Sequence, residues 1–366
     1  MQINIEKKTD KTFYSQVLVI IISILSALFF IAILLLLLGH NPIEVYKELF
    51  SSAFLTGWGI VDTTIKSIPL LLIALGLSIA FKMELWNIGG EGQFYLGAIA
   101  ATWIAVFLFP ELNSWLLIPL ILISGFIAGA ILGAIVGVLK AYLGVNEIVS
   151  TLMFNYIAIY LSDFLVYGHW RDPEGYNFPM TKAFSEQARL PKLFNTNIHF
   201  GLIFGLILAL LVYYYINKTT NGFEMKIIGD SERTARYAGI NVKKNIVLAL
   251  LISGGIAGFA GAVQMAGVQY QLQHGFSPGY GYTAIIVAWL GKLNPLAIIL
   301  VSFIMGGLLV GGEQIQLFLH IPLSIVNVLQ ASILFFLLAG EVLNNYKISI
   351  SFNSELKVKD GDNPGI

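Results

Sequence analysis

One polar, glycine-rich stretch holds the side chains best placed for chemistry. It reads Glu84-Leu85-Trp86-Asn87-Ile88-Gly89-Gly90-Glu91-Gly92-Gln93 and lies between apolar runs at 67–81 and 94–109. Three glycines in four residues favour a break in the helix. In a bilayer such a break must be buried in protein or line a wet cavity. Glu91 is costly at membrane depth unless paired or hydrated, which makes it a candidate functional residue. A cytoplasmic loop with a helix cap is the alternative.

The sequence motifs that resemble those of enzymes give little support for catalysis. The run 275–279 fits G-x-S-x-G, but Pro278 follows Ser277 and lacks the N–H that an oxyanion hole needs. No G-x-x-x-x-G-K-[ST] loop occurs, so any ATP is bound by another subunit. The absence of Cys excludes thiolate sites, and the five His show no ligand spacing and are expected at the surface. We therefore expect no catalytic residue, no metal site and no cofactor.

The composition indicates a membrane protein. The 366 residues are 57% hydrophobic and 11% charged, whereas a soluble domain is about a quarter charged. Lys plus Arg equals Asp plus Glu, so no charge surplus favours nucleic acid as a partner.

Apolar runs predict an all-α polytopic fold with about ten transmembrane helices. The second and eighth spans are short, so tilted or broken helices are expected there. The ten spans are expected near residues 17–38, 67–81, 94–109, 115–139, 146–167, 198–216, 245–268, 283–291, 296–311 and 322–339. In the fourth and seventh spans, Gly and Ala recur at every fourth position and predict close helix packing.

The Lys and Arg bias gives the orientation and the domain organisation. A cytoplasmic N-terminus (1–16) and a cytoplasmic tail (341–366) flank one membrane domain at 17–340. This domain includes an outer, periplasmic loop at 168–197 and an inner loop at 217–244. Lys66 then falls in an outer loop, ahead of the second span.

The inner loop predicts one short helix. Asp230 or Ser231 can cap its start, and Gly239 can end it in the left-handed conformation. Its apolar side consists of Ala235, Ala238 and Ile240. Such a helix has too little apolar surface to be stable alone, so it is expected to dock on a partner. An interfacial helix on anionic lipid is the alternative.

Four collinear motifs between residues 67 and 340 together resemble a known family. They are Asn87–Gln93, Asn146–Tyr156, Gly229–Ile240 and Gly279–Pro295. They are similar to signatures of the permease subunits of bacterial ABC importers for nucleosides, in the superfamily that also serves branched-chain amino acids and ribose-type sugars. Asp230 departs from the usual Asn of that family, and Trp289 from the usual Leu.

The resemblance implies a non-catalytic subunit of an importer in the inner or plasma membrane. The implied partners are a cytoplasmic ABC ATPase, a periplasmic or lipoprotein substrate-binding protein, and a second, paralogous permease in a heterodimer. It also implies that the inner loop contacts the ATPase. The implied coupling residues are Gly229, Asp230, Glu232, Arg233, Ala235, Arg236, Tyr237 and Gly239.

Polar side chains within the spans are candidates for a nucleoside path, because amides suit ribose hydroxyls and base edges. Interhelical hydrogen bonding is the alternative role. The candidates are Asn87, Glu91, Gln93, Asn155, Gln264, Gln314, Asn327 and Gln330. A second break is expected at 273–282, toward the outside, and the first toward the inside. Two oppositely oriented breaks are expected of an inverted-repeat transporter.

Three other functions stay open from the sequence. The same machinery could carry a simple sugar or a branched-chain amino acid. A stand-alone ion-coupled transporter would need intramembrane acids, for which Glu91, Glu147 and Glu313 are the candidates. A membrane scaffold without transport is the third.

Overall fold

The computed structural model describes residues 2–7, 13–193 and 195–351. The expected cytoplasmic segments 1–16 and 341–366 therefore lie partly outside the described residues. The chain forms two compact units, the first from Met1–Gly39 with Ala331–Ile366 and the second from His40–Gln330. A single membrane domain over 17–340 stays a prediction.

The first unit pairs the two ends of the chain. It contains α1 (Phe13–Leu37) and the later part of α13 (Ser324–Asn345), where the Ser23 hydroxyl donates to the Phe336 carbonyl at 3.0 Å. The strands β1 (Gln2–Lys7) and β2 (Tyr346–Ser351) are antiparallel. The sequence analysis missed this pair, although both segments alternate polar residues with isoleucine, a period of two that is typical of strands.

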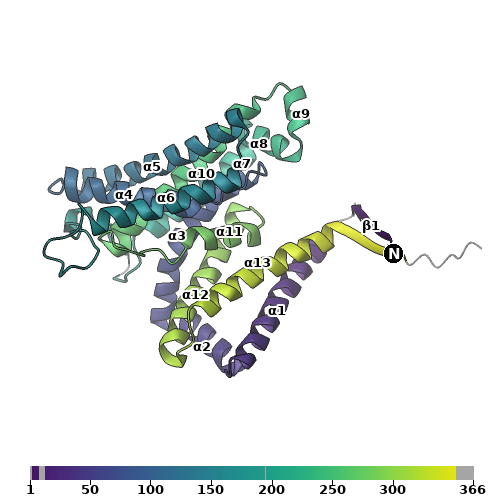
Figure 1. Cartoon of the computed structure of the whole chain (residues 1–366), viewed down its shortest axis with the longest axis horizontal. Coiled ribbons are helices and arrows are strands. Elements are labelled where there is room, and N and C mark those ends of the chain that lie inside the picture. Colours follow the sequence, from purple (N-terminus) through teal and green to yellow (C-terminus); the bar gives the residue numbers. More distant parts are fainter. Residues whose placement is uncertain (1, 8–12, 194, 352–366) are drawn as a thin grey trace, which may run out of the picture. The chain divides into compact units, whose positions relative to one another are not determined.

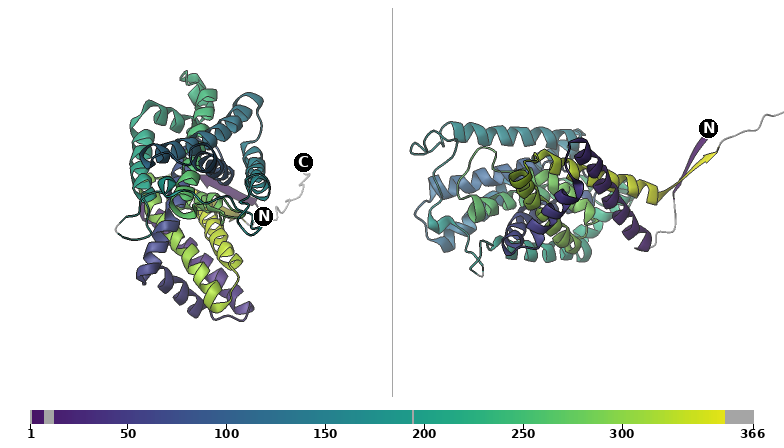
Figure 2. Two further views of the ribbon diagram at one scale, coloured as in Figure 1. Left: turned by 90° about the vertical axis from the view of Figure 1, so that its left-hand side faces the viewer. Right: turned by 90° about the horizontal axis from the view of Figure 1, so that it is seen from below.

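The named elements of the second unit are all helices, joined by turns and by one long loop between α6 and α7 (Figures 1 and 2). Asparagine side chains cap several helix starts, such as Asn146, whose Oδ1 accepts the Ile148 N–H at 2.9 Å. Its helices are α2 (Pro42–Phe54), α3 (Gly57–Phe81), α4 (Gly90–Thr102), η1 (Trp103–Leu108), α5 (Ser114–Leu143), α6 (Glu147–Tyr167), η2 (Glu186–Ala188), α7 (Gly201–Lys218), α8 (Thr220–Asp230), α9 (Glu232–Tyr237), α10 (Val242–Gln264), η3 (Met265–Gln269), α11 (Tyr280–Leu290), α12 (Pro295–Leu319) and the start of α13.

The all-α polytopic fold is confirmed. Among the described residues, seven helices are long and apolar enough to cross a membrane, and three shorter apolar helices bring the total to the ten expected. The prediction of a short second span is wrong, because α3 begins at Gly57 and has 25 residues. Asp62 and Lys66 in its first turns lower the local hydropathy and concealed this start. The eighth span is short as predicted, since α11 has 11 residues.

The core of the second unit forms around α10, which packs against α3, α4 and α5. The α5–α10 contact is made through glycines, as the sequence predicts. A Cβ added to Gly129 would lie 2.8 Å from the Gly258 Cα, and one added to Gly125 would lie 2.5 Å from the Ala262 Cβ. The two backbones therefore approach more closely than any larger residue permits.

We expect Gly129→Ala to lower the stability of the protein by about 1–3 kcal/mol, because the added methyl must force α5 and α10 apart. The measurement is the thermal denaturation midpoint in detergent. Gly57→Ala is the matched control, since no atom lies within 4 Å of the position of its Cβ. Equal midpoints for the two variants would contradict this account of the contact.

Candidate functional site

The two predicted breaks meet in the structure. Glu91, in the first turn of α4, accepts hydrogen bonds from the Ser277 hydroxyl at 2.6 Å and from the Gly281 N–H at 2.5 Å. Ser277 Oγ also accepts the Gly279 N–H at 3.2 Å and the Tyr280 N–H at 3.3 Å. Glu91 and Ser277 thus cap α11, because its own N-cap residue, Gly279, has no side chain to do so.

The first turns of α4 and α11 touch at glycines. A Cβ added to Gly281 would lie 2.5 Å from the Glu91 Cα, and one added to Gly90 would lie 3.7 Å from the Gly281 Cα. Each half of the chain therefore contributes a helix, a break and a second helix whose N-terminus reaches this point. The placement of one break inside and the other outside, and the inverted repeat, stay predictions.

Buried amides hold the first break. Asn87 Nδ2 donates to Ser253 Oγ at 2.9 Å and to Gln93 Oε1 at 3.1 Å. Asn155 Oδ1 accepts the Gly92 N–H at 2.8 Å, so α6 supplies a cap for α4. Asn87, Gln93 and Asn155 are fully buried. The structure thus brings these three together with Glu91 and gives all four hydrogen-bond partners within the protein.

The other four predicted path residues lie apart from this cluster. Gln264 of α10 lines a large pocket, and Gln314 of α12 lines a smaller one of about 320 Å³. Gln330 is buried, and its Oε1 accepts from the Thr283 hydroxyl at 3.0 Å. Asn327 is exposed.

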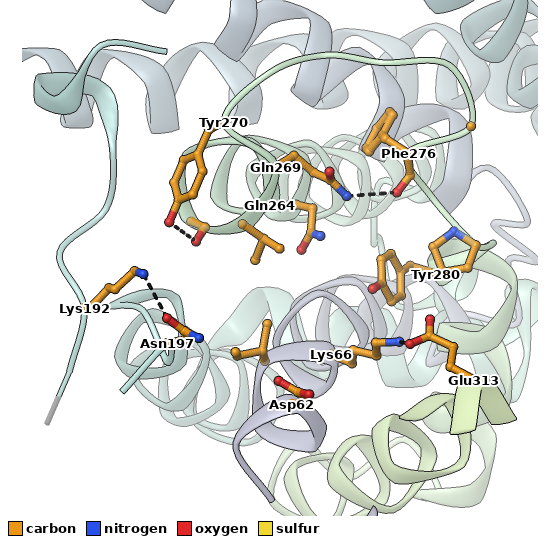
Figure 3. Close-up of a pocket in the computed structure, with 15 residues that line it drawn as sticks. Asp62, Lys66, Lys192, Asn197, Gln264, Gln269, Tyr270, Phe276, Tyr280 and Glu313 are labelled. Carbon is orange, nitrogen blue, oxygen red and sulfur yellow. Dashed lines mark hydrogen bonds and ion pairs between the residues drawn. The ribbon is translucent and has the colours of Figure 1, made fainter. Parts of the chain in front are cut away.

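The large pocket has a volume of about 650 Å³ (Figure 3). Small-molecule sites in proteins typically enclose about 300–1,000 Å³. Its walls come from α3, α10 with η3, the segment 275–280 and α12, and from Lys192 and Asn197 ahead of α7. The pocket and the first break share α11, since Tyr280 lines the pocket and the next residue, Gly281, bonds to Glu91.

One side of this pocket is charged. Lys66 of α3 forms an ion pair with Glu313 of α12, and Asp62 lies one turn before Lys66 on α3 (Figure 3). The sequence analysis left Asp62 and Lys66 outside the second span and so missed them. Their spacing of four residues, directly ahead of an apolar run, places both on one face of a helix and was the available signal.

The opposite side of the pocket is made of aromatic rings and amides. Phe276 and Tyr280 are 4% and 5% exposed, and Gln264 is 3% exposed. Gln269 Nε2 donates to the Phe276 carbonyl at 3.3 Å and holds the segment after η3 against the pocket. Figure 3 shows the amide of Gln264 directed into the cavity, on the side away from Asp62.

The long loop between α6 and α7 packs against the second break. The Thr181 N–H donates to the Leu272 carbonyl at 2.9 Å, and the Phe184 N–H donates to the Tyr270 carbonyl at 2.6 Å. Toward the end of α6, Asp163 Oδ1 lies 2.8 Å from His274 Nδ1, within hydrogen-bond distance. Part of this loop is therefore packed against the segment that follows η3 and is not merely solvated.

The prediction of surface histidines is wrong for His199, which is fully buried ahead of α7. Its Nδ1 accepts the Gly201 N–H at 3.1 Å. Burial lowers the pKa of His199 to about 4, so the ring is neutral at pH 7. Among the described residues, no group of three or more His, Cys, Asp and Glu could hold a metal ion.

The inner loop holds two helices instead of the one predicted, α8 and α9. Ser231 caps α9 by accepting the Thr234 N–H at 3.2 Å, and Gly239 follows it with φ +75°. Asp230 is the last residue of α8, so it is not the N-cap of α9 that the sequence analysis offered as an alternative to Ser231. The predicted apolar side is also partly wrong, because Ala238 is exposed.

The eight predicted coupling residues lie mostly at the surface of these helices. Ala235 is buried, and Gly229 is half-buried. The exposed members are Asp230, Glu232, Arg233, Arg236, Tyr237 and Gly239. Figure 1 shows α9 at one end of the second unit and the loop after α6 at the other.

The helix α8 packs against the residues where the first break begins. A Cβ added to Gly229 would lie 3.3 Å from the Met83 Cα, in the turn that follows α3. Burial, and then the nearby charge of Lys226 on α8, lower the pKa of Lys82. The Asn245 amide of α10 donates to Glu224 of α8 at 2.8 Å. The α8–α9 segment is thus joined to both α3 and α10.

We expect Glu91→Gln to lower the stability of the protein by about 1.5–3 kcal/mol, because an amide replaces a charged acceptor and its NH₂ group cannot accept the Gly281 N–H. Uptake of the transported solute should fall strongly while the protein is still inserted. The measurements are the thermal midpoint in detergent and uptake by cells. Glu84→Gln, an exposed site in the same stretch, is the control. Wild-type uptake and stability in Glu91→Gln would refute this role.

Comparison with known proteins identifies the family. Residues 59–338 match the family described as branched-chain amino acid transport system / permease component. A glucose ABC transporter permease of Haloferax volcanii is 30% identical over 91% of this chain and 90% of its own. A guanosine ABC transporter permease of Bacillus subtilis is 32% identical over 88% and 93%, and a nucleoside ABC transporter permease of Lactococcus lactis is 33% identical over 88% and 90%. The chain belongs to this family of ABC transporter permeases.

Proposed function

We propose that this chain forms the translocation path for nucleosides in an ATP-driven importer and couples to a cytoplasmic ATPase through α9. The observation that supports this most strongly is a continuous set of contacts. It runs from α8, through the turn at Met83 and the first break, to Glu91 and the start of α11. Tyr280, the first residue of α11, lines the 650 Å³ pocket.

These contacts supply a route for mechanical coupling. The surface of α9 carries Arg233, Arg236 and Tyr237, all exposed, while Ala235 on its other side is buried against the bundle. A protein docked on the exposed side would move α8 with α9. That movement would reach the pocket through the hydrogen bonds of Glu91.

The proposed assembly follows the family. The chain spans the membrane many times with both ends in the cytoplasm, beside a second, paralogous permease. An ATPase binds at the α9 end, and a periplasmic or lipoprotein substrate-binding protein delivers solute at the other end. The nucleoside cargo rests on the guanosine and nucleoside permeases among the relatives. The glucose permease among them supports a simple sugar as the second candidate.

The sequence offered three acids for a stand-alone ion-coupled transporter. Each of the three acids considered for ion coupling already has a partner. Glu91 accepts two hydrogen bonds, Glu147 pairs with Lys140 at 2.7 Å, and Glu313 pairs with Lys66. A coupling carboxylate must instead exchange its ion with the solvent during transport.

The coupling role predicts that Arg233→Glu with Arg236→Glu weakens ATPase binding by about tenfold or more, because reversing charges at an interface costs several kcal/mol. Co-purification of the ATPase with this chain measures the effect. Arg171→Glu, an exposed site in the loop after α6, is the control. Wild-type co-purification and uptake in the double variant would overturn the assignment of α9.

The cargo is tested by uptake of labelled guanosine, adenosine and uridine in cells with and without the gene. Glucose, ribose and leucine are measured in parallel. We expect deletion to abolish uptake of one or more nucleosides and a plasmid copy to restore it. Loss of glucose or leucine uptake instead, with nucleoside uptake intact, would replace nucleosides by that solute.

A further inference from the structure

The buried amide of Gln264 is the feature of the large pocket that most clearly points to a ligand. Gln264 is 3% exposed and lines the cavity, yet its side chain makes no hydrogen bond with any residue that the structure describes. Other amides nearby, such as that of Gln269, have partners within the protein. Gln264 is therefore placed to bond to a molecule in the pocket.

The chemistry around Gln264 suits a planar heterocycle. A primary amide offers one acceptor and two donors, which match a ring edge that carries a donor beside an acceptor. Tyr280 and Phe276 line the same deep part of the pocket, and aromatic rings pack well against flat rings. Adenine, guanine and uracil all carry such an edge.

Asp62 lies on the other side of the cavity from Gln264 (Figure 3). The charge of Glu313 is matched by Lys66 in an ion pair. Asp62 has neither a hydrogen bond nor an ion pair within the part of the chain that the structure describes, and it is exposed. A carboxylate has two acceptor oxygens, so it can accept from both hydroxyls of a cis-diol.

We propose that this pocket is a ribonucleoside-binding station on the path, in which Gln264 bonds to the base edge and Asp62 accepts from the 2′- and 3′-hydroxyls of the ribose. This inference rests on the proposed function and deepens it. The base lies at the buried end with Tyr280, and the sugar lies toward the exposed end. The pocket thereby selects ribonucleosides over dideoxynucleosides.

The test is equilibrium binding to the complex of this chain with its transporter partners in proteoliposomes, without the substrate-binding protein. That omission matters because the binding protein has its own selectivity. The probes are the ribonucleoside that cells take up best and its 2′,3′-dideoxy form. We expect the wild-type complex to bind the ribonucleoside about 10- to 100-fold more tightly than the dideoxy form, as loss of hydrogen bonds to a charged group predicts.

Substitutions of Asp62 and Gln264 should change binding in two different ways. Asp62→Asn should reduce the preference for ribose over dideoxyribose to less than about threefold, with little change in dideoxynucleoside binding. Gln264→Ala should weaken both nucleosides about equally and keep their ratio. A misfolded protein would show neither pattern. Glu111→Gln and Gln316→Ala, both exposed and outside the pocket, are the matched controls.

Three results would be decisive against these proposals, and they are distinguishable. If cells take up nucleosides but the wild-type complex binds none, or if both variants bind like the controls, the station is wrong and the proposed function stands. A ribose preference unchanged in Asp62→Asn overturns the role of that carboxylate. Absence of nucleoside uptake through the wild-type protein overturns the proposed function itself.

Discussion

The hydrogen bonds of Glu91 are the constraint on which the centre of this permease depends. A buried carboxylate is costly in a membrane protein, and so are the unpaired N–H groups at a helix N-terminus. In this structure the two groups satisfy each other. Glu91 accepts hydrogen bonds from the Gly281 N–H and the Ser277 hydroxyl at the start of α11. A helix of 11 residues can therefore begin inside the bundle.

This arrangement separates residues that hold the backbone from residues that can meet a solute. The first group makes hydrogen bonds to the backbone of the two breaks and to each other. It consists of Asn87, Glu91, Gln93 and Asn155. Their substitution would first disturb the breaks. In the adjacent pocket, Gln264 and Asp62 approach from opposite sides and have capacity for further hydrogen bonds. Because α11 borders both regions, a shift of its first turn would alter the pocket directly.

The sequence predicted features that depend on local pattern. The breaks, the close α5–α10 contact and the ends of α9 at Ser231 and Gly239 follow from glycine placement and capping residues. Features that depend on distant partners were missed. Asp62 and Lys66 look like loop residues until Glu313 on α12 is seen beside Lys66. His199 looks like a surface residue until the fold buries it.

Relatives of this chain are named for glucose and for nucleosides, and the proposed role of Asp62 bears on both. Both kinds of solute carry neighbouring hydroxyls, and a carboxylate such as Asp62 can accept from either. A base adds a flat ring whose edge carries a donor beside an acceptor, and a sugar lacks such a ring. In this chain Gln264, Tyr280 and Phe276 occupy the deep end of the pocket. In the proposed binding mode these three residues meet the base, which is the part of a nucleoside that a sugar lacks.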